Sequence, residues 1–234
     1  YYPVQEAKPV LHICKAKFPN ESNLSLGITK AMQLDNTEAE SRVIKSKAYP
    51  DMKIDVAVNR SLIDFYNTYP SAYTNNDKMT YFRVYADTPM NEDVKKQIYP
   101  ALRSCLQGLS EHQAVSRLLN FVQTGFEYEY DETIWGCDRA FFAEETLYYH
   151  YCDCEDRSIL LTRLIRDLLG LDCVLIYYPG HLACAVNFTQ KEKGDYYMYN
   201  QKEYTVCDPT YINAPIGVQM PNFKDKEATV VPIK

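Results

Sequence analysis

The segment from Asp153 to Gly170 restricts the possible folds more than any other part of the chain, because it has the pattern of one strong helix. Asp153 is suited to cap the first turn, with Asp156 three residues further on, and Gly170 ends the pattern. The apolar residues recur at helical spacing and form one broad face, made of Leu160, Leu161, Leu164, Ile165, Leu168 and Leu169. The sequence therefore predicts a helix that opens at Cys154.

Strands are predicted directly after this helix. Residues 172–178 and 181–188 are strand-like apolar runs joined by the turn Pro179-Gly180. Residues 196–199 and 203–207 read as the two arms of a hairpin. Since helices precede these strands, the second half of the chain has the layout of an α+β fold with an antiparallel sheet.

Two further helices are predicted in front of the strong one. Asn91 is suited to cap a helix that runs to about residue 105, and Ser110 with Gln113 forms a capping-box pattern that opens the next. The stretch 125–150 is aromatic, acidic and aperiodic, so we interpret it as a long loop, a kind of segment that is often functional.

The first 90 residues carry weaker signals. Residues 9–18, 52–58 and 79–85 alternate in the manner of half-buried strands, and residues 59–69 are compatible with a short helix. The pattern changes from alternation to helix near residue 90. We therefore divide the chain into a mainly β accessory region, residues 1–90, and a second domain, residues 91–234.

Composition excludes several classes of protein. Of the 234 residues, 46% are hydrophobic and 24% charged, which is ordinary for a globular protein and excludes intrinsic disorder. The formal net charge of −6 argues against nucleic-acid binding, which needs clustered Lys and Arg. The longest apolar run, residues 173–178, is far shorter than the about 18 residues of a membrane span. Eight cysteines permit disulfide pairing without demanding it.

Three residues of the second domain have the features of a cysteine nucleophile and its partners. Cys154 lies at the N-terminus of a helix, where unpaired N–H groups and the helix dipole favour a thiolate. His181 opens a strand and Asp208 follows the end of another, so both are suited to a sheet edge. A thiol nucleophile needs a base, and the base needs a group that orients it. The plainer alternatives are a buried cysteine, a turn histidine and an aspartate that starts a turn.

These residues lie in motifs that resemble the transglutaminase-like cysteine-enzyme superfamily. The run Cys154-Glu-Asp-Arg-Ser-Ile-Leu-Leu-Thr-Arg-Leu-Ile-Arg166, followed by Gly170-Leu171, looks like the nucleophile helix of that family. His181 matches its histidine at the start of a strand, and Asp208-Pro-Thr matches the motif that closes its triad. The resemblance covers about residues 110–215 and is nearest to uncharacterised transglutaminase-like proteins of bacterial cell envelopes.

The resemblance implies a papain/transglutaminase-like core in residues 91–234, with a catalytic triad of Cys154, His181 and Asp208. It also implies a thiol-dependent acyl-transfer enzyme, a peptidase or amidase or else a transglutaminase, that takes a peptide or protein substrate in a groove and needs no cofactor. An exported protein of the periplasm or cell envelope would fit. Trp135 and Gln123 are candidates for the second oxyanion donor beside the N–H of Cys154.

Two other functions stay open. One is a non-catalytic binding module that keeps the transglutaminase-like fold. The other is a metal-binding protein that uses His150, Cys152 and Cys154, although their H-x-C-x-C spacing is not that of a structural zinc knuckle.

A working triad also makes a topological prediction. In a simple meander of three strands, His181 and Asp208 would lie at opposite ends of the sheet. Strand 203–207 must therefore run antiparallel to strand 181–188, with residues 189–202 as an excursion. We expect the Cys154 sulfur within about 4 Å of one ring nitrogen of His181, and Asp208 at the other nitrogen.

Overall fold

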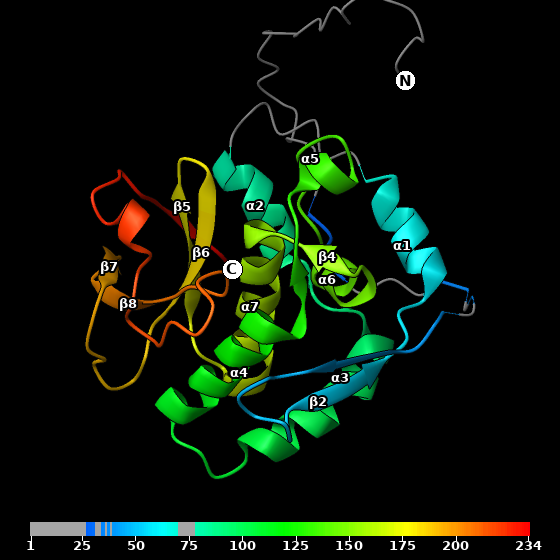
Figure 1. Cartoon of the computed structure of the whole chain (residues 1–234), viewed down its shortest axis with the longest axis horizontal. Coiled ribbons are helices and arrows are strands. Elements are labelled where there is room, and N and C mark those ends of the chain that lie inside the picture. Colours follow the sequence, from blue (N-terminus) through cyan, green and yellow to red (C-terminus); the bar gives the residue numbers. More distant parts are fainter. Residues whose placement is uncertain (1–26, 31–33, 36, 38, 70–77) are drawn as a thin grey trace, which may run out of the picture.

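The fold is seen in a computed structural model, which describes residues 27–30, 34, 35, 37, 39–69 and 78–234 (Figure 1). The strand predicted at residues 9–18 lies outside the described residues. No helix in the described part of the chain is long and apolar enough to cross a membrane.

A curled, antiparallel five-stranded sheet forms one side of the molecule (Figure 1). The strands follow one another in the order β7-β8-β6-β5-β9. Their bounds are β5 Cys173–Tyr178, β6 His181–Val186, β7 Tyr196–Tyr199, β8 Lys202–Cys207 and β9 Thr229–Pro232. The strands predicted at 172–178, 181–188 and in the hairpin are confirmed, and β9 is an element that the sequence pattern did not reveal.

The predicted pairing of strands 181–188 and 203–207 is confirmed. β8 pairs antiparallel with β6, with Cys184 opposite Cys207 and Val186 opposite Thr205. β7 lies outside β8 at the edge of the sheet, so residues 189–202 leave the sheet centre and return along its margin. This connection brings the start of β6 and the end of β8 to the same end of the sheet.

Helix α7, Cys154–Leu169, is the centre of the fold (Figure 1). One side of α7 packs on β5 and β6, and other sides contact α4 (Glu111–Gly125), α6 (Ala143–Tyr148) and α2 (Lys78–Asp87). All of its residues from Cys154 to Ile165 are buried. A helix surrounded in this way is a rigid base for whatever its first residue presents.

The predicted helix ends are confirmed. Asn91 caps α3, Glu92–Leu106, by accepting a hydrogen bond from the N–H of Asp93, and Ser110 with Gln113 forms a capping box at α4. At α7 the N–H of Asp153 donates to Asp156 at 3.1 Å. Gly170 ends α7 with a φ of 69°, a left-handed conformation that glycine adopts without strain.

The region before residue 90 differs in part from its prediction. β1 (Arg42–Lys45) and β2 (Lys53–Val56) form a two-stranded sheet, and α1 (Arg60–Asn67) is the expected short helix. Residues 79–85 were predicted as a strand, which is wrong because they belong to α2. The buried side chains Phe82, Tyr85 and Ala86 stand at i, i+3 and i+4, so helical spacing was hidden within the alternation.

The two-domain division stays a prediction, but one hydrophobic core crosses its boundary. This core contains Ile54 and Leu62 together with Leu118 and Leu160. Within the described residues, the first region holds two helices and one two-stranded sheet, and is therefore mixed in structure rather than mainly β.

The stretch 125–150, which the sequence predicts as one long loop, includes several short helices and strands. It contains β3 (Glu127–Tyr128), α5 (Asp131–Ile134) and α6, and β3 pairs in parallel with β4 (Tyr151–Cys152). Elements of two to six residues do not repeat long enough to leave a periodic signal. Together they bring the acidic turn of α5 beside the start of α7 (Figure 1).

Candidate active site

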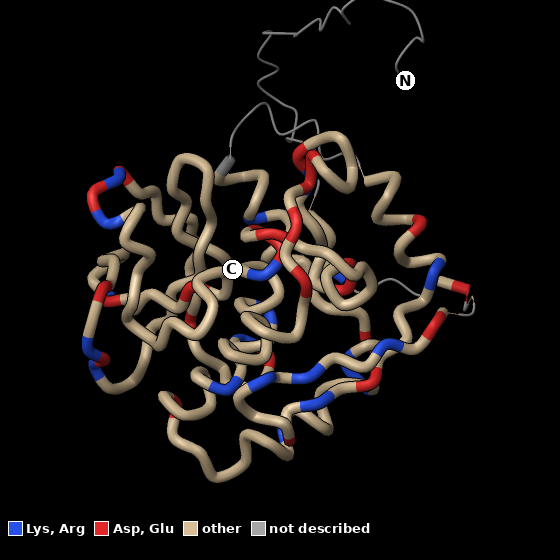
Figure 2. The backbone as a smooth tube through the Cα atoms, viewed as in Figure 1, with Lys and Arg blue, Asp and Glu red and all other residues tan. Residues whose placement is uncertain are grey.

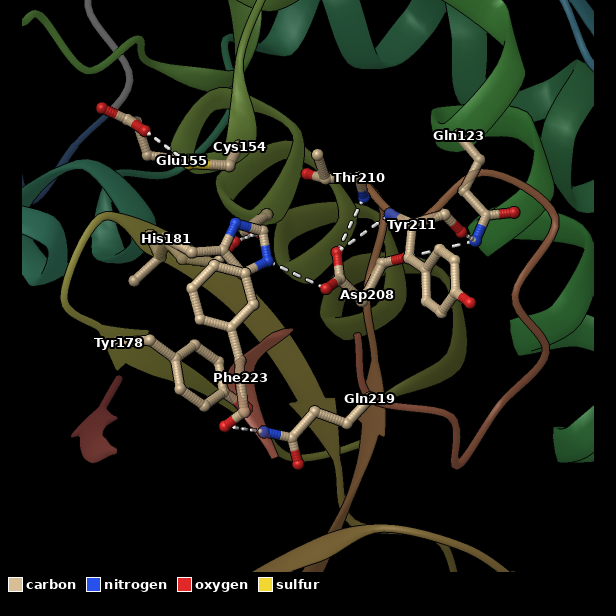
Figure 3. Close-up of polar contacts among 12 residues, drawn as sticks. Gln123, Cys154, Glu155, Tyr178, His181, Asp208, Thr210, Tyr211, Gln219 and Phe223 are labelled. Atoms are coloured by element: carbon tan, nitrogen blue, oxygen red, sulfur yellow. Dashed lines mark hydrogen bonds and ion pairs between the residues drawn. The ribbon is translucent and has the colours of Figure 1, made fainter. Parts of the chain in front are cut away.

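His181 and Asp208 form a buried pair at one end of the sheet. The Nε2 atom of His181 lies 2.8 Å from Oδ2 of Asp208, and the two residues are 6% and 2% exposed. β6 begins at His181 and β8 ends one residue before Asp208, so the antiparallel pairing of these strands creates the contact. The structure thus brings together two of the three predicted triad residues as expected (Figure 3).

The carboxylate of Asp208 is held on both oxygens. Oδ1 accepts hydrogen bonds from the backbone N–H groups of Thr210 and Tyr211, at 2.8 and 3.2 Å. Oδ2 is therefore left for His181. A carboxylate accepts hydrogen bonds only, so the atom of His181 that faces it carries the proton. This fixes the tautomer with hydrogen on Nε2 and leaves Nδ1 as the unprotonated nitrogen of the neutral ring.

Aromatic rings fix the plane of the imidazole. The ring of Phe223, from the short 3₁₀ helix η2 (Pro221–Phe223), stacks on His181 with centroids 4.7 Å apart and planes 20° apart. Tyr178 lies further off, with its centroid at 6.0 Å and its plane at 16°. Gln219 donates to the carbonyl of Phe223 at 2.9 Å and so holds η2 over the ring (Figure 3). The imidazole consequently has little freedom to rotate.

Cys154 occupies the first position of α7, as the sequence predicts. It is buried to the same degree as His181, with 8% of its surface exposed. The N–H of Leu182, the residue after His181, points at its sulfur, and Ser158 donates to the carbonyl of Leu182 at 3.0 Å. The first turn of α7 is therefore docked against the start of β6.

The thiol of Cys154 is turned toward its neighbour in sequence. Sγ donates to Oε2 of Glu155 at 3.0 Å, and no hydrogen bond joins it to the ring of His181. Figure 3 shows Cys154 and Glu155 on one side of the imidazole and Asp208 on the other. The predicted approach of the sulfur to within about 4 Å of a ring nitrogen stays a prediction.

The surroundings keep this thiol protonated. Burial raises the pKa of Cys154 well above its ordinary value, and the negative charges of Glu155 and Asp153 raise it further. The hydrogen bond from Leu182 acts in the opposite direction but is the weaker influence. The thiolate that the helix N-terminus favours is thus opposed by the acidic residues next to it.

Cys154 and His181 line one cavity of about 400 Å³. Its other walls come from four places: α2, the stretch that includes β3 and α5, the first turn of α7 and the β5–β6 turn. Five acidic residues and four aromatic residues contribute, namely Asp131, Glu132, Asp138, Asp153, Glu155, Phe82, Tyr128, Tyr130 and Tyr177. Figure 2 shows the acidic residues gathered around α5 and beside the start of α7.

Neither candidate for the second oxyanion donor is placed for that role. The amide of Gln123 donates to the backbone carbonyls of Asp208, Tyr211 and Ala214, so its two protons are already used to hold the turn after β8. The ring of Trp135 packs edge-on against Phe141, and Trp135 does not line the cavity. Gln123 instead supports the segment that orients Asp208.

The metal site proposed from the H-x-C-x-C spacing is not formed by the described residues. His150 is exposed, whereas Cys152 is buried and accepts a hydrogen bond from Arg157. Candidate ligand atoms within 4.8 Å of one another do occur at the start of α7, in groups such as Asp153 with Cys154 and Glu155.

Two parts of the site escaped the sequence pattern. The sequence shows that Glu155 and Asp156 are acidic. It does not show that Glu155 accepts the hydrogen bond of the thiol, because a helix turn does not fix the rotamers of its first residues. Phe223 lies in a C-terminal segment without periodicity, and only its aromatic character hinted at a role.

Comparison with models of known protein families gave no match, and no curated protein matches the chain at a significant level.

Proposed function

We propose that the protein is a thiol-dependent acyl-transfer enzyme acting on amide or peptide bonds, with Cys154 as nucleophile, His181 as base and Asp208 as the group that orients the base. The observation that carries the proposal is the buried contact of 2.8 Å between His181 and Asp208, beside a cavity that also exposes Cys154. A transglutaminase-like, papain-related core accounts best for the resemblance of the motifs and for a nucleophile helix packed on an antiparallel sheet.

The geometry supports the following sequence of steps. Nδ1 of His181 takes the proton of the Cys154 thiol, and the sulfur attacks the carbonyl carbon of the substrate amide. The imidazolium, stabilised by Asp208, then gives the proton to the departing amine, which leaves a thioester on Cys154. Water or a second amine attacks the thioester and restores the thiol. Since both branches share the first half-reaction, the proposal covers hydrolysis and amine transfer alike.

The proton of the resting thiol has to change its partner. In the structure Sγ of Cys154 donates to Glu155, and in the proposed first step the proton goes to His181 instead. Catalytic hydrogen bonds often tighten only when substrate is bound. The resting arrangement is therefore compatible with an enzyme whose thiol gives its proton to His181 when an electrophile, either a substrate amide or an alkylating reagent, reaches the sulfur.

The same hydrogen bond favours a second candidate, a non-catalytic binding module. A buried thiol whose pKa is raised and whose proton is held by a carboxylate is a poor nucleophile. In that case the cavity would bind a ligand and Cys154 would be inert.

Alkylation separates the two functions. We expect iodoacetamide to modify Cys154 far faster than the exposed Cys137 near neutral pH, and the His181→Ala variant to lose this difference. A peptide-amide library screened with an acyl-trapping probe should then label the wild type and not the Cys154→Ala variant. Alkylation of Cys154 no faster than that of Cys137, with no acyl-enzyme from any peptide, would leave the binding module as the better description.

A further inference from the structure

The cavity beside Cys154 has an unusual balance of charge. Asp131, Asp153 and Glu155 line it and are buried, while none of the described residues in its wall is a lysine or an arginine. None of these three carboxyl groups takes part in an ion pair with another described residue. Burial and the neighbouring acidic groups raise the pKa of Asp131 to about 7 and the pKa of Asp153 to about 11, so without a cation the cluster holds protons in place of charges. A cation bound beside these groups would displace those protons and offset the cost of burying the charges.

Asp153 gives a second, independent observation. It is only 8% exposed, and its Oδ1 atom is buried without a hydrogen-bond partner. A carboxylate oxygen of Asp153 lies within 4.8 Å of Cys154 Sγ and of Glu155, so the unpartnered group stands next to the nucleophile. A buried polar atom without a partner in its own chain is commonly satisfied by a water or a ligand.

The remaining walls favour an organic cation over a metal ion. Tyr128, Tyr130 and Tyr177 line the cavity, and aromatic rings attract ammonium and guanidinium groups through their faces. Hard metal ions take oxygen ligands and gain nothing from such rings. Two of the carboxylates already accept a hydrogen bond on one oxygen, Asp131 from the N–H of Arg139 and Glu155 from Cys154. Incomplete oxygen sets suit a donor-rich cation better than a compact coordination shell.

We infer that this cavity binds the ammonium or guanidinium group of a basic side chain in the acyl donor, next to the amide that Cys154 attacks. The inference rests on the proposed function for the identity of the reacting bond, although the binding of the cation does not. Asp131 and Glu155 would form charge-assisted hydrogen bonds to the cation, while the tyrosine rings cover its carbon chain. Peptides with lysine or arginine at this position would be substrates, and acidic peptides would be excluded.

The first experiment measures binding without chemistry. Blocked tripeptides with lysine, norleucine or glutamate between two glycines are tested for protection of Cys154 against iodoacetamide, with glutathione as a reference thiol. We expect saturable protection by the lysine peptide, at concentrations at least about tenfold lower than for norleucine and with none for glutamate. Equal protection by lysine and norleucine would overturn the inference.

Charge-removing variants show whether the cavity is the binding site. Asp131→Asn keeps the oxygen that accepts from Arg139 and removes the charge that Asp131, whose pKa burial raises to about 7, carries above that pH. We expect it to abolish the preference for lysine over norleucine. Asp172→Asn is the matched control, because its carboxylate is exposed, pairs with Lys202 and directly precedes β5, at the opposite end of that strand from His181. Loss of the preference in the control as well, or its persistence in Asp131→Asn, would refute the assignment.

Two further arms separate the possible cations. Protection by Ca²⁺ or Mg²⁺ that matches protection by the lysine peptide would identify a metal site and overturn the inference. Protection by free methylamine equal to that of the peptide would point to an amine acceptor, and would likewise overturn a role in the acyl donor.

The test also keeps the two proposals distinguishable. If the Cys154→Ala variant and the wild type are equally inactive but protection is selective, the cation site stands and catalysis fails. If peptides are cleaved or transferred without regard to charge, catalysis stands and the cation site fails.

Discussion

Replacing Asp208 by asparagine tests the site most directly, because the two carboxylate oxygens have different partners. Oδ1 accepts from the N–H groups of Thr210 and Tyr211, which only an oxygen can do. The asparagine oxygen will therefore take that position, and its NH₂ group will face Nε2 of His181. An NH₂ group donates, so Nε2 must become the acceptor and the imidazole proton moves to Nδ1. The base that faces Cys154 is then lost.

The expected effects differ by orders of magnitude. A triad with its histidine in the wrong tautomer loses roughly a thousandfold or more in kcat. Stability changes much less, since a charged hydrogen bond is exchanged for a neutral one at a cost of about 1 kcal/mol. For a domain of this size that lowers Tm by about 2–4 °C.

Four measurements follow the variant. The alkylation rate of Cys154 at neutral pH should fall at least about tenfold, because direct ionisation of the thiol replaces proton transfer to His181. Nitrogen NMR of the imidazole should show the proton on Nδ1 instead of Nε2, and thermal unfolding should show the small change in Tm. With a peptide substrate, kcat/KM should fall with the alkylation rate.

Asp87→Asn is the matched control for this variant. Asp87 also accepts from a backbone N–H, that of Lys234, and pairs with a cation, Arg166, near the end of α7 away from Cys154, and it does not line the cavity. Its asparagine variant should match the change in Tm and keep the alkylation rate. An Asp208→Asn protein whose Cys154 reacts as fast as in the wild type would show that Asp208 does not orient the base.

Three further variants test single contacts, two beside the candidate site and one remote from it. Glu155→Gln should lower the raised pKa of Cys154, because it removes a nearby negative charge. The midpoint of the pH–alkylation curve should therefore move to lower pH, and an unchanged midpoint would assign the raised pKa to burial alone. Phe223→Ala should cost about 1 kcal/mol of stability in denaturant unfolding and reduce kcat/KM, since the ring no longer fixes the imidazole; stability loss with unaltered kinetics would make Phe223 purely structural. Arg166→Ala should lower the unfolding free energy by about 1 kcal/mol and leave alkylation of Cys154 unchanged, because Arg166 pairs with Asp87 at the far end of α7; an altered alkylation rate would contradict this.

The sequence predicted the structure best where a short-range pattern agrees with the contacts of the folded protein. The capping patterns at Asn91, Ser110 and Asp153 act within one turn of helix, so they could be read without knowledge of the fold. The pairing of β6 with β8 was predictable for another reason: His181 and Asp208 have to meet, and strand length rules out the simple meander.

The failures have equally specific causes. Residues 79–85 satisfy a two-residue and a helical period at once, and tertiary contacts decide between them, since the helix buries Phe82 and Tyr85 against the rest of the core. The role of Gln123 depends on three carbonyls that lie more than eighty residues away in sequence. No local pattern contains such information.

The buried pair also bears on the register of the sheet. The last four residues of β8 are buried, and both faces of the strand carry apolar or small side chains there, such as Val206 and Cys207. Hydrophobicity alone therefore does not distinguish two registers that differ by one residue. Asp208 does choose. In the observed register, with Cys184 opposite Cys207, its carboxylate meets His181 and two backbone N–H groups. A slip by one residue would turn that carboxylate to the other face, toward the apolar packing of α7, where an uncompensated charge costs several kcal/mol. We infer that the residues proposed to orient the base also hold the strands in the alignment that makes the orientation possible.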